Sequence, residues 1–323
     1  MRALKVLLVA IAALMAGIPQ APAQEWPDKP LHFIVPFAAG GSTDVLTRLL
    51  CEQLTVKLKT PCVVENKGGA GGNLGGAAVA AAPADGTTFL VSAPGVLAYN
   101  KILYREMAFD PDKDLDPICL YAFQPNVLVI HPALPVKSVA ELIAYAKAHP
   151  RQLNYASGGV GSTSHVAGEL FRTMAGLEWQ HVPYRGTGPS LVDLLAGQVQ
   201  LTIDNLPAIL PHIRSGALRA LAISTAHRVP LLPDLPTIAE AGLPGYAAIS
   251  WQMVAAPMGT PRPILDRMAG TISKLTAEPA FRARVAEAGA EAAGGTVDEA
   301  RAFVKQETVK WREVVLKSGA RAD

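Results

Sequence analysis

The chain has 323 residues, half of them hydrophobic, with 29 basic and 27 acidic side chains. A length of this order with such a large apolar fraction predicts a substantial core and two domains rather than one. The near-neutral charge argues against nucleic acid as a partner, because nucleic-acid binding requires a concentrated basic face.

The first 23 residues differ in composition from the rest of the chain. Arg2 and Lys5 form a short basic start, residues 6–18 are almost wholly apolar, and Ala21-Pro22-Ala23 is an A-x-A cleavage signal. This pattern predicts a signal peptide over residues 1–23, cleaved near Ala23, and an exported protein. A retained membrane anchor is the alternative, but the apolar run is too short to span about 30 Å of hydrocarbon.

From residue 31 onward, segments typical of strands alternate with segments typical of helices. This alternation predicts an α/β fold with parallel sheets, in which ligands bind outside the carboxyl ends of the strands. The predicted strands are residues 31–35, 61–65, 88–92, 118–130, 154–157, 201–203, 218–224 and 250–256. The predicted helices are residues 43–57, 73–82, 138–149, 164–175, 189–196, 208–215, 263–277, 279–288 and 297–317.

Two extended segments, residues 118–130 and 249–256, are candidates for strands that cross between two lobes. The tripeptide Gln124-Pro125-Asn126 interrupts the first of them. We therefore expect a ligand cleft between two lobes joined by crossing strands. Residues 24–123 and 251–323 would form a discontinuous lobe 1, and residues 124–250 would form lobe 2.

Two glycine-rich loops each lie between a predicted strand and a predicted helix. A helix N-terminus exposes unpaired N–H groups and the positive end of the helix dipole, and glycines let an anion approach the backbone. The two loops therefore predict an anion held between the lobes, although ordinary turns with Ser, Thr or Asp caps are an alternative. The candidate ligand-binding residues are Phe37, Ala39, Gly40, Gly41 and Ser42 in the first loop, and Ser157, Gly158, Gly159, Ser162 and Thr163 in the second.

Two further polar residues follow strand-like segments and are also candidate ligand-binding residues. Tyr184 opens a third strand-to-helix loop, in which Arg185 is either a solvent-facing charge or a ligand contact. Asp204 ends the predicted strand 201–203 and either caps the following helix or contacts the ligand.

No residue is predicted to be catalytic, and neither a metal nor a cofactor is expected. Ser162, His165 and Asp204 could be assembled into a triad, but Ser162 and His165 lie three residues apart at one helix start, without a G-x-S-x-G elbow. The seven histidines are dispersed, without metal-ligand spacing, and neither glycine-rich loop ends in the Gly-Lys-Ser/Thr of a P-loop.

The chain contains three cysteines, so one pair at most can bond within a monomer. Cys51 and Cys62 are near enough in sequence for a helix-to-strand disulfide. Buried free thiols, with Cys119 among them, are the alternative.

Six motifs in the same order give the chain a family resemblance. They are WPDKP at 26–30, VPFAAGGSTD at 35–44, VVENKGGAGGN at 63–73, ASGGVGS at 156–162, HVPYRG at 181–186 and LPDLPTIAEAG at 232–242. Over almost the whole mature length the chain resembles the periplasmic substrate-binding proteins of tripartite tricarboxylate transporters, the Bug family.

The resemblance implies a periplasmic-binding-protein-like fold whose two lobes close on a small organic acid. One ligand carboxylate would be held by the loop from Phe37 to Ser42 and the loop from Ser157 to Thr163, partly through ordered water. The ligand class is a mono-, di- or tricarboxylate, aliphatic or aromatic. The implied role is a monomeric, non-catalytic periplasmic receptor that delivers this ligand to membrane transporter subunits. One alternative is a receptor that presents its ligand to a signalling partner. Another is an exported esterase or amidase.

Overall fold

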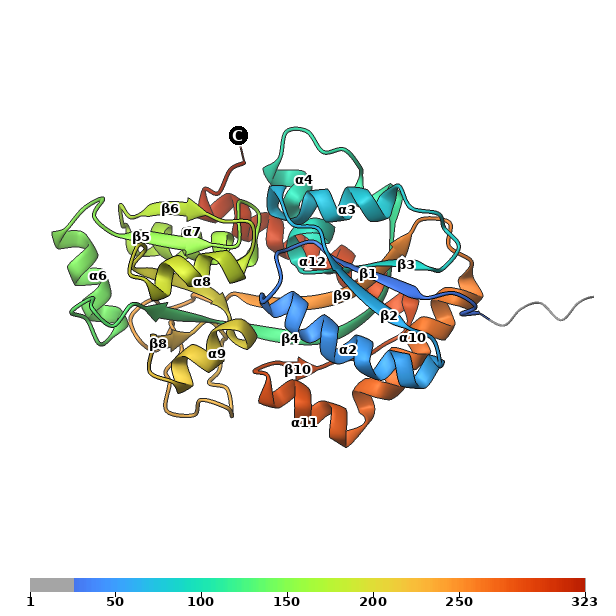
Figure 1. The fold of residues 1–323 in the computed structure, drawn as a ribbon. Coiled ribbons are helices and arrows are strands. Elements are labelled where there is room, and N and C mark those ends of the chain that lie inside the picture. Colours follow the sequence, from blue (N-terminus) through green and yellow to red (C-terminus); the bar gives the residue numbers. More distant parts are fainter. Residues whose placement is uncertain (1–25, 323) are drawn as a thin grey trace, which may run out of the picture.

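The computed structural model describes residues 26–322, so the predicted signal peptide over residues 1–23 lies outside the described part of the chain. Figure 1 shows an elongated molecule with a sheet running along its length and helices on both sides. The strand order is β2-β1-β3-β9-β4-β7-β5-β6, and β8 and β10 also pair with β4. The strands are β1 (Leu31–Val35), β2 (Cys62–Asn66), β3 (Thr88–Ser92), β4 (Leu115–Ile130), β5 (Asn154–Ser157), β6 (Gln180–Pro183), β7 (Leu201–Asn205), β8 (Arg219–Ile223), β9 (Ile249–Pro257) and β10 (Glu291–Ala292).

The helices fill the intervals between the strands, and each long helix coincides with a predicted one. They are α2 (Ser42–Leu58), α3 (Asn73–Ala80), α4 (Asn100–Leu103), α5 (Pro111–Asp114), α6 (Val139–Ala148), α7 (Thr163–Ala175), α8 (Thr187–Leu195), α9 (Leu206–Arg214), α10 (Arg262–Ala277), α11 (Pro279–Glu287) and α12 (Val297–Ser318), with a 3-10 turn η1 (Ala70–Gly72) and a π-helical turn η2 (Gly95–Tyr99). Within residues 26–322, no helix is both long enough and apolar enough to cross a membrane.

The predicted α/β alternation is confirmed, but the prediction of parallel sheets throughout is wrong. β1 is parallel to β2 and β3, and β5 is parallel to β6 and β7. Between these two parallel groups, β4 is antiparallel to β7, β8 and β9, and β9 is antiparallel to β3. The long strands β4 and β9 run in opposite directions, so the middle of the sheet is antiparallel. We call the part formed by β1, β2, β3 and β9 the β1 end, and the part formed by β5 to β8 the β5 end.

β4 is one strand of 16 residues, and the predicted interruption at Gln124-Pro125-Asn126 is wrong. Pro125 pairs with Ile249, at the end of the ladder between β4 and β9, and Asn126 begins the ladder with Asn205 of β7. Proline has no N–H to donate, so it is tolerated where a strand changes partners. β4 therefore runs from the β1 end into the β5 end without a break.

Apolar side chains fill both faces of each end of the sheet. At the β1 end, one face packs against α2, α10 and α11 around Leu50 and Met268, and the other packs against α3, η2 and α12 around Tyr99 and Trp311. At the β5 end, α6 and α7 cover one face, and α8 and α9 cover the other. These layers fix the directions of α2, α7, α8 and α9, whose first residues follow the ends of strands (Figure 1).

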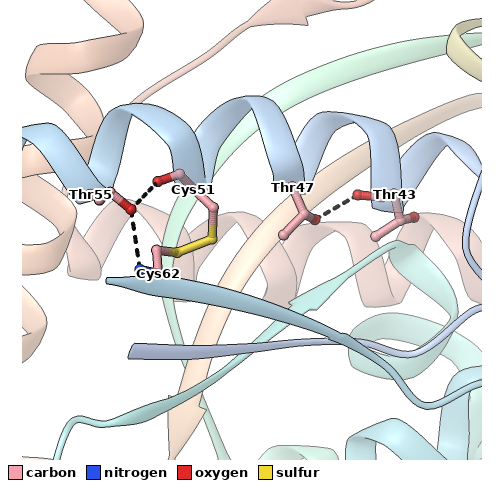
Figure 2. Close-up of a disulfide and its surroundings, with 5 residues drawn as sticks. All are labelled: Thr43, Thr47, Cys51, Thr55 and Cys62. Carbon is pink, nitrogen blue, oxygen red and sulfur yellow. Dashed lines mark hydrogen bonds between the residues drawn. A yellow bond between two sulfur atoms is a disulfide. The ribbon is translucent and has the colours of Figure 1, made fainter. Parts of the chain in front are cut away.

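Cys51 and Cys62 form a disulfide, which decides between the two alternatives that the sequence left open. Cys51 lies on α2 and Cys62 begins β2, with their Cα atoms 5.3 Å apart (Figure 2). Thr55 Oγ1 donates a hydrogen bond to the Cys51 carbonyl at 2.9 Å and accepts one from the Cys62 N–H at 3.1 Å. Cys119 is a free, fully buried thiol on β4.

Candidate functional site

Four helices begin around one small cavity of about 20 Å³ between the two ends of the sheet. α2 comes from the β1 end, and α7, α8 and α9 come from the β5 end. The first N–H groups of each helix have no partner within the helix, and each N-terminus carries a partial positive charge. The cavity is lined by Phe37, Gly41, Ser42, Thr43, Ala93, Gly158, Ser162, Thr163, Ser164, Thr187, Asp204 and Asn205.

The first glycine-rich loop contributes three of its five candidate residues to the wall of the cavity. Phe37, Gly41 and Ser42 line it, and the backbone of Gly41 caps α2 without a side-chain hydrogen bond. Ala39 and Gly40 are exposed outside the cavity; Gly40 has a φ of +80° and donates its N–H to Asp44 Oδ2. This loop therefore presents an open helix N-terminus to the cavity.

Ser42 joins the two ends of the sheet across the cavity. Its Oγ donates to the carbonyl of Asn205 at 3.1 Å and accepts from the N–H of Ala208, in the first turn of α9, at 3.0 Å. Next to it, Thr43 Oγ1 accepts from the side-chain amide of Gln252 on β9 at 3.1 Å. In this conformation the hydroxyls of Ser42 and Thr43 are therefore both hydrogen-bonded within the protein.

The second glycine-rich loop contributes Gly158, Ser162 and Thr163 to the wall. Ser162 is the N-cap of α7, because its Oγ accepts from the backbone N–H of His165 at 3.2 Å. Ser157 is buried behind the wall, where its Oγ lies 2.5 Å from His181 Nε2 and accepts from the Gly159 N–H at 3.1 Å. Side-chain hydrogen bonds therefore hold this loop from behind.

Gly159 and Tyr184 line a second, outer pocket of about 430 Å³ that also touches Gly158. The Tyr184 hydroxyl donates to Asp193 Oδ2 at 2.6 Å. Arg185 lies at the same pocket with an exposed side chain, and its carbonyl accepts from the Ala38 N–H. The two predicted residues Gly159 and Tyr184 are thus placed beside the cavity rather than in its wall.

Asp204 is 1 % exposed and forms part of the cavity wall. Its Oδ2 accepts from Thr187 Oγ1 at 2.8 Å, and its Oδ1 accepts from the Asn205 N–H at 2.7 Å. Burial raises the pKa of this carboxyl to about 6. The helix-cap interpretation of Asp204 is wrong, because α9 begins at Leu206 with Asn205 at its N-cap.

Two stacked imidazoles lie behind the second loop. The rings of His165 and His181 are 4.3 Å apart, and His165 Nδ1 accepts from the Gly161 N–H at 3.2 Å. Burial lowers the pKa of His165 to about 4 and that of His181 to about 3, so both are neutral near neutral pH. A neutral imidazole can accept at Nδ1, and this bond fixes the proton of His165 on Nε2.

The residues of the candidate triad do not meet as a triad. Ser162 Oγ contacts the backbone N–H of His165 and the hydroxyl of Ser164, whereas the His165 ring contacts Gly161. A serine nucleophile needs the base within hydrogen-bond reach of its hydroxyl. Over the described residues, no group of His, Cys, Asp and Glu is arranged to hold a metal ion.

The wall also contains residues that were not among the predicted ligand-binding residues. Thr43 and Ser164 are the neighbours of predicted residues, and Thr187 lies in the third strand-to-helix loop. Asn205 directly follows Asp204, and Ala93 follows the carboxyl end of β3. Extending the rule that ligands bind at strand ends to every predicted strand would have found Ala93 and Asn205.

A family model described as tripartite tricarboxylate transporter family receptor matches residues 46–320. The chain belongs to this family. Among its relatives is the protein BugT of Bordetella pertussis (strain Tohama I), 39 % identical over 316 residues that cover 98 % of this chain and 96 % of BugT.

Solved structures of relatives share the fold over nearly the whole described chain. The R. palustris protein Rpa4515, solved with adipate, is 42 % identical with a TM-score of 0.90, over 92 % of this chain and 99 % of that one. MatC of Rhodopseudomonas palustris, solved with bound malate, is 34 % identical with a TM-score of 0.85, over 90 % of this chain and 100 % of that one. The family resemblance and the predicted α/β fold with its likeness to periplasmic binding proteins are confirmed.

Proposed function

We propose that this receptor binds one small aliphatic dicarboxylate, with one carboxylate in the cavity where α2, α7, α8 and α9 begin. The observation that carries the proposal is the convergence of four helix N-termini on a cavity lined by neutral side chains and a single carboxyl group. Backbone N–H groups and helix dipoles stabilise an anion without a formal cation. Relatives solved with adipate and with malate support a dicarboxylate as the ligand class.

The rest of the ligand extends into the outer pocket beside Gly159 and Tyr184. This pocket shares Gly158 with the cavity, and its volume of about 430 Å³ is within the range of small-molecule sites. Arg185 supplies a guanidinium group at the same pocket, which suits a second carboxylate.

The protein works outside the cytoplasm and passes its ligand to membrane subunits of a tripartite transporter. The signal-peptide pattern of residues 1–23 and the family support a periplasmic location. The Cys51–Cys62 disulfide agrees with it, because such bonds persist in oxidising compartments. Binding, not turnover, is the proposed activity, and Ser162 serves as a helix cap.

Calorimetric titration of the mature protein with adipate and malate tests this function. We expect binding of one ligand per chain that is unchanged by a chelator. Adipamide, which has the same carbon chain with neutral ends, is the matched control and should not bind, because the helix N-termini select for negative charge. Equal binding of adipamide, or loss of adipate binding on chelation, would contradict the proposal.

A further inference from the structure

Asp204 presents a carboxyl group to the cavity that, under the proposed function, receives the carboxylate of the ligand. Its side chain is almost fully buried, its oxygens accept hydrogen bonds from Thr187 and Asn205, and Ser164 is a third hydrogen-bond partner. A cavity of about 20 Å³ brings any anion inside it close to these oxygens. If Asp204 and the ligand carboxylate are both ionised, they repel each other strongly, because they are close together and shielded from water.

No cationic side chain lines the cavity to offset this repulsion. On α7, which packs against β7, Glu169 is paired with Arg172 and with the hydroxyl of Tyr155 from β5. On α8, Asp193 accepts from Tyr184. These ionisable groups of the β5 end are thus engaged with partners other than Asp204.

The charged side chains of the remaining elements around Asp204 do not pair with it either. Asp44 in the first turn of α2 is ion-paired with Arg48, and α9 carries its basic residues, His212 and Arg214, in its last turn. His165 on α7 and His181 on β6 are neutral above about pH 5, because burial lowers the pKa of each.

We propose that Asp204 takes up one proton from solvent when the receptor closes on its ligand, and that the resulting acid donates a hydrogen bond to the ligand carboxylate. This inference rests on the proposed function, because it requires an anion in the cavity. A pair of carboxyl groups that share one proton is a well-established solution to the burial of two acids. Asp204 is then a specificity-determining residue. Once protonated it carries no charge and donates a hydrogen bond, so that a carboxylate can bind beside it.

The pH dependence follows with a definite sign. Burial already raises the pKa of Asp204 to about 6, and a bound anion raises it further. At acid pH, where the carboxyl is already protonated in the free receptor, binding takes up little proton. At higher pH the free receptor is ionised, and each further pH unit weakens binding by up to about tenfold. The two histidines do not change charge in this window.

Calorimetry in two buffers of different ionisation enthalpy measures the proton uptake directly. The probe is adipate or malate, whichever binds more tightly, titrated at about pH 5.5 and about pH 7.5. We expect uptake to rise from a small fraction to close to one proton per ligand between these values. Tight binding at the higher pH with no dependence of the heat on the buffer would overturn the inference and leave the proposed function intact. Absence of binding by either probe at both pH values would overturn both.

The Asp204→Asn variant keeps the size of the side chain and a donor at the cavity, but cannot titrate. We expect it to bind without proton uptake and with an affinity that is independent of pH between about 6 and 8, at least equal to wild type at the upper limit. The matched control is Glu169→Gln, another buried acid of the β5 end that does not line the cavity, and it should keep the uptake of wild type. Uptake that persists in Asp204→Asn would assign the proton to another group. Because the wild-type titration needs no variant, poor folding of Asp204→Asn would leave the test in force.

Discussion

Gly41 and Gly158 both line the cavity, and their backbones do not require glycine. Gly41 has a φ of −78°, and Gly158 is not among the glycines with positive φ. A Cβ on Gly41 would lie 3.6 Å from Thr187 Cβ, and one on Gly158 would lie 3.5 Å from the Thr187 nitrogen, which is ordinary contact. Gly159 differs, because its φ is +114° and a Cβ there would lie 2.7 Å from the Tyr184 carbonyl oxygen. We therefore attribute glycine at positions 41 and 158 to the space that an anion needs. At position 159 glycine is required by the backbone conformation of the loop.

Substituting valine for Gly41 or Gly158 should weaken binding more than folding. The added methyl groups occupy the space where a carboxylate would meet the helix N-termini, so we expect adipate affinity to fall at least about tenfold, or about 1.4 kcal/mol. Thermal unfolding should remain cooperative, because neither position has a strained backbone. Titration calorimetry on the folded variants measures the affinity.

Gly270→Ala provides the control, because it lies on α10 with no neighbouring atom within 4 Å of an added Cβ. We expect this variant to bind as wild type does and to be slightly more stable, since alanine favours a helix interior over glycine. Normal adipate binding by both valine variants would show that the two loops are structural turns.

At the scale of elements, the disulfide ties the middle of α2 to the first residue of β2 (Figure 2). It closes a loop between two cysteines 11 positions apart. Replacing both Cys51 and Cys62 by serine should lower the free energy of unfolding by about 2–4 kcal/mol, because the unfolded chain regains the freedom of that loop. Urea unfolding of the oxidised wild type and the double variant measures this difference.

Adipate affinity of the same double variant should not change, because neither cysteine lines the cavity. Wild type treated with a reductant serves as the comparison, since it loses the bond without a change of sequence. Equal unfolding free energies for the two oxidation states would show that the bond does not constrain the unfolded chain.

The elements that the sequence predicted well are those with strong local signals. Residues 88–92 and 154–157 are strands with the predicted bounds, because short apolar runs there end at polar or glycine residues. The turn η2 and the short helices α4 and α5 were not predicted, since segments of four or five residues carry too little periodicity. The antiparallel course of β4 and β9 depends on pairing between distant segments, which local pattern does not encode.

Sequence reasoning located the cavity at the right strand ends but not all of its residues. Gly158 and Asp204 were candidates because each follows a strand, and both line the wall. Ser157 was a candidate for the same reason, yet its side chain points toward His181 behind the wall. Which side of a loop a hydroxyl occupies depends on packing partners from other elements, and these are not legible in a local motif.

At the scale of the whole molecule, the two ends of the sheet are close together with little space between them. The cavity holds about one water molecule, which is far less than a dicarboxylate needs. Among the described side chains, Gln124, Asn126 and Gln252 on β4 and β9 carry buried polar atoms without hydrogen-bond partners. Such atoms cost about 1–3 kcal/mol each while they stay buried, and contact with water would offset that cost.

We therefore expect the unliganded protein to open in solution by a hinge in β4 and β9. The proposed moving bodies are lobe 1, residues 24–123 and 251–323, and lobe 2, residues 124–250. Solution scattering should give a smaller radius of gyration with saturating adipate than without it. Gly158→Val, at an adipate concentration that saturates wild type but not this variant, is the control and should keep the larger radius. An identical radius for wild type in both conditions would indicate a fixed pocket.

The cysteine arrangement has a practical consequence for observing this motion. Two of the three cysteines are bonded to each other and Cys119 is fully buried, so the folded protein offers no thiol to a maleimide dye. Val56 on α2 and Val192 on α8 are 67 % and 66 % exposed and lie on opposite sides of the cleft. The substitutions Val56→Cys and Val192→Cys would each add one reactive thiol for a dye. Labelled at both positions, this receptor reports its own occupancy by energy transfer, and no native cysteine has to be removed first.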